Sequence, residues 1–229
     1  MNSFSDILAK LGEISPLVWL IIVVLLVGSL IGIGVLLLKP KSSYKKASSR
    51  LHTKQLVYGG MCIAIAFVLS YIRLYKMPYG GSITLASMFP IILYAIIFGP
   101  IPGIIAGVAY GFLQLIQDAW VLNWAQLLFD YPLAYGCLGL AGMAPRALKN
   151  IQLRLCIAIP IALLGRGLMH FISGVIFFAD SAPEGMNPIY YSFIYNASYL
   201  VPELIITLIL ALALASTPIY SAMRKAAIN

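Results

Sequence analysis

The sequence predicts an all-α, polytopic membrane protein with seven spans in a one-plus-six arrangement. Of its 229 residues, 62% are hydrophobic and only 10% are charged, and so few charges could not cover a soluble domain of this size. The apolar residues lie in long blocks. Blocks of that kind indicate helices that contact lipid around their circumference.

The first predicted span covers residues 17–38 and follows a short extracellular segment, residues 1–16. It is long enough to cross about 30 Å of hydrocarbon at about 1.5 Å per residue. The segment before it is not basic and no small-residue cleavage site follows, so we expect a retained anchor rather than a secretory signal. A basic linker, residues 39–54, comes next and is expected to be cytoplasmic.

The rest of the chain forms one predicted membrane domain, residues 55–220, followed by a cytoplasmic tail, residues 221–229. Breaks that contain Pro or Gly divide this domain, because both residues stop or redirect helices. Six spans are expected near residues 55–73, 83–98, 102–117, 122–144, 152–178 and 189–215.

The distribution of basic residues predicts the orientation. If the 39–54 linker is inside the cell, eleven of the fifteen Lys and Arg residues lie inside, as the positive-inside rule requires. The N-terminus is then outside and the C-terminus cytoplasmic, in a plasma-membrane protein. The net charge of +8 is explained by this clustering, so the expected partner is the lipid bilayer and not nucleic acid.

Several kinds of chemistry have no motif in this chain. There is no Walker A sequence and no metalloprotease or hydrolase signature, so we expect neither ATP binding nor an enzyme. The only histidines, His52 and His170, fall on opposite sides of the membrane in this topology. We therefore expect no metal and no cofactor.

Four ionisable residues fall inside predicted spans: Asp130, Arg166, His170 and Glu203. Such residues usually face the bundle interior, a cavity or one another. Arg166 and His170 are four residues apart and share a helix face. We expect Arg166 to form a structural pair with Asp130 or Glu203, and Asp130 and His170 to lie near the external mouth of the bundle.

Aromatic and polar residues are predicted at the same membrane level. Trp120 lies in an outer loop, and Tyr191 begins a stripe of tyrosines that repeats every four residues. An aromatic belt at the lipid headgroups accounts for part of this pattern, but it does not need Asn196 or Asp130. A carboxylate with aromatic faces around it suits a flat organic cation.

Small residues mark two predicted contact faces. Glycines recur every four residues from Gly99 to Gly111, a stripe that favours close helix packing within the chain. Gly60 and Ala64 form a similar pair on the 55–73 span, which could face another subunit.

Three stretches carry a resemblance to a known family. They read PYGGSITL at residues 78–85, LFDYPLA at residues 128–134, and RGLMHFISGVIFF at residues 166–178 followed by Tyr191 and Asn196. Over roughly residues 55–215 the chain resembles the thiamine-specific S-components of energy-coupling factor (ECF) vitamin importers. The resemblance implies a six-helix bundle that binds thiamine near its outer face, with a separate transmembrane coupling subunit and two ATPase subunits as partners.

The resemblance also implies which residues bind the ligand. Carried over by position, these are Asp130, Tyr131, His170, Gly174, Phe178, Tyr191, Asn196, Trp120 and, as a possible cover, Tyr79. Gly60 and Ala64 fall where S-components dock on the coupling subunit. The chain departs from the family in two ways: a tryptophan found in some members would fall near Gly81, and the 17–38 span lies outside the six-span core.

Three alternatives remain open at this point. The chain could be an S-component for another vitamin or a thiamine precursor, in which case Asp130 is the discriminating residue, because only a cation needs it. It could be an intramembrane enzyme that uses His170 with Ser173 or Ser192. It could also be a structural membrane subunit without a ligand.

Overall fold

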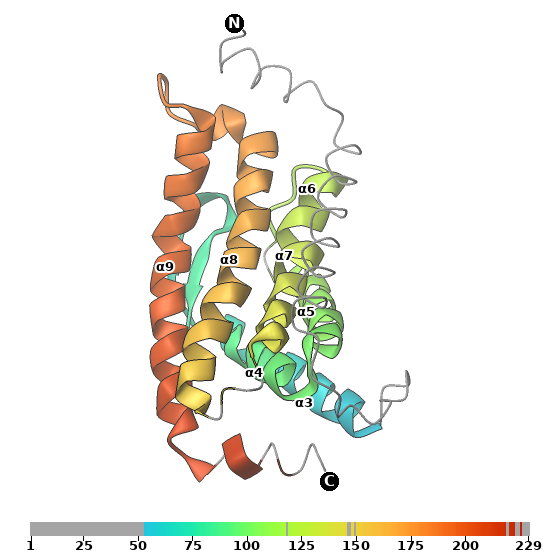
Figure 1. Ribbon diagram of the computed structural model, residues 1–229. Helices are drawn as coiled ribbons and strands as arrows, with labels where there is room; N and C mark the ends of the chain where they lie inside the picture. The colour runs from blue at the N-terminus through green and yellow to red at the C-terminus, as the bar shows by residue number, and fades with distance from the viewer. Residues whose placement is uncertain are drawn as a thin grey trace, which may run out of the picture.

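The computed structural model describes residues 53–117, 119–145, 148, 150–218, 220–222 and 225. The predicted segments 1–16 and 17–38, nearly all of the 39–54 linker and most of the 221–229 tail lie outside these residues. The described part is a bundle of helices, in which α8 and α9 run roughly parallel to each other (Figure 1).

Three of the described helices are long and apolar enough to cross a membrane: α3 (Thr53–Ser70), α8 (Ile151–Phe177) and α9 (Pro188–Ala215). The side chains of Asn150 and Asn187 cap α8 and α9 by accepting backbone N–H groups of the first turn, which satisfies donors that have no partner inside the helix. These helices confirm the predicted multi-pass, mainly helical membrane fold.

The two following apolar helices are shorter than predicted. They are α4 (Phe89–Phe98) and α5 (Pro100–Gln114). Gly99 joins them with a φ of 107°, a left-handed conformation that glycine adopts without steric cost. The chain therefore turns sharply between them, as the predicted break at this point requires.

The predicted 122–144 span is not one regular helix. It consists of α6 (Trp124–Leu128), a π-helical turn η2 (Phe129–Leu133), α7 (Ala134–Gly136) and a 3₁₀ segment η3 (Cys137–Met143). Pro132 lies within the π-helical turn, where its missing N–H and its ring disrupt the α-helical hydrogen-bond ladder. The widened turn carries Asp130, one of the predicted site residues.

The glycine stripe of α5 packs against this broken span. A Cβ on Gly107 would lie 2.2 Å from the carbonyl oxygen of Tyr135, and one on Gly103 would lie 3.0 Å from the Cα of Gly139. Backbones can approach this closely only where side chains are absent. The prediction of packing within the chain is confirmed.

An antiparallel β-hairpin replaces two predicted features. The expected loop over residues 73–81 contains strand β1 (Arg73–Lys76) and the turn η1 (Pro78–Gly80), and the expected start of a span at residue 83 is strand β2 (Ser82–Thr84). Thr84 is held in this extended segment by Glu203 of α9, which accepts its backbone N–H at 2.8 Å and its hydroxyl at 2.5 Å. The hairpin thus lies along α9, behind α8 and α9 in the view of Figure 1.

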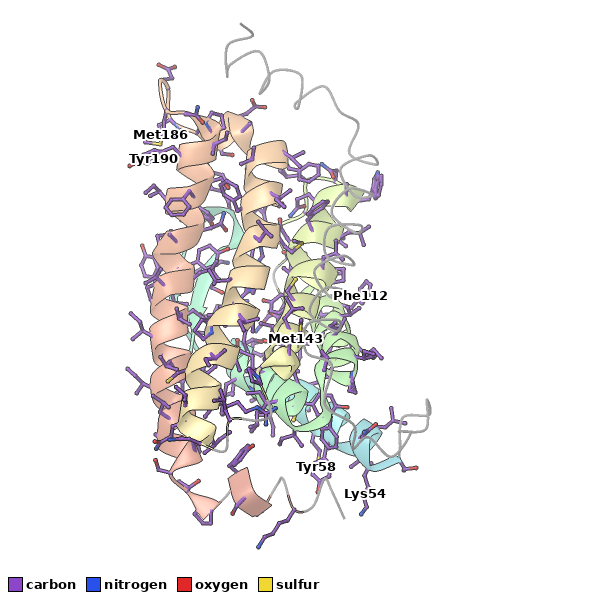
Figure 2. All side chains as sticks on the ribbon, viewed as in Figure 1. Lys54, Tyr58, Phe112, Met143, Met186 and Tyr190 are labelled. Carbon is purple, nitrogen blue, oxygen red and sulfur yellow. The ribbon has the colours of Figure 1, made fainter. Side chains whose placement is uncertain are left out.

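The main apolar core joins α3, α4, α5, η3, α8 and α9. Its fully buried members include Ile91, Leu138 and Ile159. In Figure 2, Lys54 and Tyr58 lie at one end of the bundle, whereas Met186 and Tyr190 lie at the opposite end. The long connection between α8 and α9 is therefore at the end remote from the start of α3.

Candidate ligand-binding site

A cavity of about 110 Å³ opens between the β-hairpin, the loop before α6, η2, α8 and α9. Every residue predicted to bind the ligand lines it: Tyr79, Trp120, Asp130, Tyr131, His170, Gly174, Phe178, Tyr191 and Asn196. Segments more than 100 residues apart in the chain supply these side chains. Their role in binding stays a prediction, but the structure brings all nine to one place.

The Asp130 carboxylate is the centre of a hydrogen-bond cluster. Its Oδ2 accepts from Gln126 Nε2 at 2.6 Å and from the Ser173 hydroxyl at 2.9 Å, and its Oδ1 lies 2.9 Å from His170 Nδ1. The side chain of Asp130 is only 15% exposed. The two donors at Oδ2 and the imidazole contact at Oδ1 hold the carboxylate in one orientation.

Gln126 is a site residue that the sequence prediction missed. It is 1% exposed and lies four residues before Asp130, on the same helix face. Its Nε2 also donates to the carbonyl of Trp120 at 3.1 Å, and its Oε1 accepts from the backbone of Leu122 at 3.0 Å. A buried amide at this spacing from an intramembrane acid is the signal that could have identified it.

Tyr131 acts on the loop that carries Trp120. Its hydroxyl accepts the Trp120 backbone N–H at 2.9 Å. Tyr131 and Gln126 therefore fold the loop so that the Trp120 side chain reaches the cavity wall.

Tyr79 lines the cavity from the hairpin turn. Its ring contacts those of Trp120, Phe178 and Tyr195 edge-on, with centroid distances of 5.9, 6.4 and 6.4 Å. Its φ of 59° is a left-handed conformation that is uncommon for a non-glycine residue. Tyr79 thus lies beside three other rings of the cavity wall, and its role as a ligand cover stays a prediction.

Gly81 explains why no large side chain stands at the neighbouring position. A Cβ there would lie 2.9 Å from Tyr195 Oη and 3.0 Å from the Tyr199 ring. The backbone N–H of Gly81 donates to Tyr195 Oη at 3.2 Å, and the same hydroxyl donates to the carbonyl of Pro78. The hairpin tip and α9 are thus in direct contact at Gly81.

Gly174 and Asn196 form the contact between α8 and α9 beside the cavity. A Cβ on Gly174 would lie 2.2 Å from Ser192 Oγ, so only glycine allows this approach. Asn196 Nδ2 donates to the carbonyl of Ser192 at 2.8 Å, and its Oδ1 accepts from the Tyr199 hydroxyl at 2.7 Å. These two hydrogen bonds of Asn196 are both made within α9. Tyr191 is half-buried at the edge of the cavity.

Among the residues that the structure describes, Arg166 forms no direct ion pair with Asp130 or Glu203, the two predicted partners, although Glu203 does interact with it electrostatically. Arg166 Nε donates to His170 Nε2 at 3.2 Å, and the guanidinium lies 4.5 Å from the centroid of the Tyr135 ring. Asp130 is already bound by other donors, and Glu203, which is 1% exposed, accepts from Thr84 instead. Across the described ranges, no group of three His, Cys, Asp or Glu side chains could hold a metal ion.

These features define a class of protein. A multi-pass helical bundle with a cavity that combines a fixed carboxylate and several aromatic faces is a membrane protein that binds a small organic molecule. Comparison with protein families identifies which one: the chain belongs to the family described as thiamine transporter protein (Thia_YuaJ), whose family model matches residues 56–222. The resemblance inferred from the sequence is confirmed.

Individual relatives agree with this assignment. The thiamine transporter ThiT of Bacillus subtilis (strain 168) is 32% identical over 154 residues, which cover 62% of this chain and 80% of that protein. ThiT of Lacticaseibacillus paracasei is 30% identical over 135 residues, which cover 53% of this chain and 67% of that protein. A solved structure of ThiT from Listeria monocytogenes matches with a TM-score of 0.64 at 23% identity, covering 73% of this chain and 96% of that one, and supports the fold.

Proposed function

We propose that this protein is the thiamine-binding S-component of an ECF-type importer, a transport subunit and not an enzyme. The observation that carries the proposal is the cavity itself, in which an almost buried carboxylate, Asp130, lies among the rings of Tyr79, Trp120 and Phe178. Thiamine has a fixed positive charge on its thiazolium ring and a flat aminopyrimidine ring. The cavity offers the complementary charge and the complementary faces.

The geometry suggests a role for each part of the site. Asp130 attracts the cation and accepts a hydrogen bond from the pyrimidine amino group. Trp120, Phe178 and the His170 ring supply flat faces, and Tyr79 closes over the ligand. Leaving a buried polar group unpaired costs about 1–3 kcal/mol, so ligands that lack the amino group or the charge are discriminated against.

The cavity is proposed to open to the outside of the cell. It is lined by residues on both sides of the α8–α9 connection, including Phe178 and Tyr191, and this end of the bundle is opposite to the basic start of α3 at Lys54. The positive-inside rule then supports a cytoplasmic C-terminus and an external N-terminus.

Transport is proposed to need further subunits: a transmembrane coupling subunit and two ATPase subunits, since the chain has no Walker A motif of its own. Gly60 and Ala64 are the proposed docking positions. Both are exposed on α3, and nothing lies within 4 Å of a Cβ placed on Gly60. A small, unoccupied face of this kind permits close approach of another membrane helix.

The enzyme alternative has no support in the site. A serine nucleophile needs a base within hydrogen-bond reach, but both ring nitrogens of His170 are engaged, Nδ1 with Asp130 and Nε2 with Arg166. The Ser173 hydroxyl donates to Asp130 and the Ser192 hydroxyl to the carbonyl of Phe171. Membership of a transporter family agrees with this reading.

The test is a titration of the purified protein in detergent, with tryptophan fluorescence as the readout. The ligands are thiamine, its separate pyrimidine moiety and a neutral vitamin such as riboflavin. Trp120 lines the cavity, so we expect saturable quenching by thiamine at sub-micromolar concentration and none by riboflavin. A Trp120→Phe variant should lose most of the signal while keeping thermal stabilisation by thiamine. Stabilisation by a different vitamin alone would support an S-component with another substrate, and no response to any vitamin would contradict the proposal.

A further inference from the structure

The binding scheme above does not use Arg166, a charged residue within α8. It lies one helical turn before His170 on α8 and is 9% exposed at the wall of the cavity. Its Nε is 3.2 Å from His170 Nε2. A cation beside a cavity for a cationic ligand calls for a specific reason.

The donor inventory of these two side chains decides how they are paired. The N–H groups of a guanidinium can only donate, so His170 Nε2 must accept and cannot carry a proton. A neutral imidazole then carries its proton on Nδ1. That atom lies 2.9 Å from Asp130 Oδ1, so the histidine donates to the carboxylate.

We infer that Arg166 is a positioning residue, which fixes His170 as the neutral Nδ1–H tautomer and through it fixes the Asp130 carboxylate for the ligand. The inference rests on the proposed function only in the identity of the ligand. Asp130 itself requires the proton on Nδ1, because a carboxylate only accepts, and without Arg166 the free Nε2 could take up a second proton. The resulting imidazolium would pair with the carboxylate and compete with the cation of the ligand.

The guanidinium of Arg166 is also held by groups other than His170, which fixes the direction in which its Nε points. Its Nη2 donates to the Tyr135 hydroxyl at 3.2 Å while the guanidinium lies over the same ring, and its Nη1 contacts the sulfur of Met88. Tyr135 belongs to α7, and Met88 immediately precedes α4. The side chain is therefore anchored by two elements other than its own, so that Nε remains aimed at the imidazole.

The experiment compares the natural protein with Arg166→Lys, which keeps a donor at this site, and Arg166→Met, which keeps a similar length without one. Histidine tautomers are read from the ¹⁵N chemical shifts of protein labelled at histidine, without ligand, and a His52→Gln variant assigns the second histidine. We expect a single Nδ1–H tautomer for His170 in the natural protein and in Arg166→Lys. In Arg166→Met we expect a fraction of doubly protonated imidazolium at the pH at which the natural protein shows only the neutral form.

Thiamine affinity is measured on the same samples. Arg166→Met should weaken binding by about tenfold or more, the effect of losing about one directed hydrogen bond to a charged group, and Arg166→Lys should restore most of it. An Nε2–H tautomer in the natural protein would overturn the inference, as would an Arg166→Met protein in which His170 stays entirely in the neutral Nδ1–H form, whether or not its affinity falls. If Arg166→Met does not fold, an Nε2–H tautomer in the natural protein would still overturn the inference.

The two proposals fail in different ways. If the natural protein does not bind thiamine, the proposed function is wrong, yet the tautomer of the ligand-free protein still tests the role of Arg166. If thiamine binds tightly but His170 carries its proton on Nε2, the function stands and the inference about Arg166 is wrong.

Discussion

Replacing Asp130 by Asn should separate the charge of this side chain from its shape. The amide is nearly isosteric, but it brings an NH₂ group into a cluster of donors. At the Oδ2 position this group would face both Gln126 and Ser173, whereas at the Oδ1 position it would face only His170. We therefore expect the amide to place its nitrogen toward His170 and to lose one hydrogen bond rather than two.

The loss of affinity follows from the missing charge. Opposite unit charges about 4 Å apart attract by about 4 kcal/mol at the effective dielectric constant of a protein surface, and part of this attraction is offset because both groups give up water on binding. A hydrogen bond to a charged group contributes about 1.5–3 kcal/mol. A net loss of about 2–3 kcal/mol corresponds to a thiamine Kd that is weakened about 30- to 150-fold.

The assay is isothermal titration of thiamine into the natural protein and Asp130→Asn at one fixed ionic strength. Glu184→Gln is the matched control, since it removes one negative charge from an exposed position outside the cavity. Its Kd should stay within about twofold of the natural value, because an exposed charge outside the cavity is screened by solvent and salt. A Kd for Asp130→Asn within about threefold of the natural protein, with the fold intact, would refute the assignment of Asp130 as the partner of the cation.

Three further predictions test the parts that enclose the cavity. Gly174→Ala would bring a Cβ to 2.2 Å from a serine hydroxyl on α9 and should lower the free energy of unfolding by about 1–3 kcal/mol. Gly60→Ala is the control, because its Cβ meets nothing within 4 Å, and it should not lower the melting temperature. Equal melting temperatures for the two variants would contradict the packing at Gly174. Thr84→Val removes the hydroxyl that donates to Glu203 at 2.5 Å. Thiamine dissociation, measured by stopped flow, should become about tenfold faster, the effect of one lost buried hydrogen bond. An unchanged rate would show that other contacts hold the hairpin. Tyr79→Ala removes the ring that covers the cavity and should raise the dissociation rate about five- to tenfold with little change in the association rate, so a selective loss of association would argue against a cover.

The candidate site was predictable to a large extent because its residues stand in short, chemically distinctive segments. Asp130 and His170 are ionisable groups inside apolar segments, a combination that indicates a functional site in any membrane protein. The resemblance then linked them to Phe178 and Asn196. The individual contacts could not be predicted from the sequence: Asn196 forms hydrogen bonds within α9, and Gln126 donates a hydrogen bond to the Asp130 carboxylate.

The β-hairpin was not predictable from local sequence. The segment around Ile83 continues without interruption into an apolar run, and helix and strand cannot be distinguished in such runs by periodicity. Its strand conformation depends on Glu203, which is 119 residues away from Thr84. Likewise, charge complementarity suggested a carboxylate partner for Arg166, but its direct contacts include the imidazole of His170 and the ring and hydroxyl of Tyr135 instead.

The arrangement around Asp130 limits what kind of ligand can bind. Of about four acceptor sites on a carboxylate, the described residues fill three, two on Oδ2 and one on Oδ1. One site on Oδ1 therefore remains for a single donor from the ligand, while the negative charge stays available to a nearby cation. A neutral ligand would bury this charge uncompensated, and a ligand without an N–H donor would leave the remaining site empty, so the cavity selects a molecule that brings both features together.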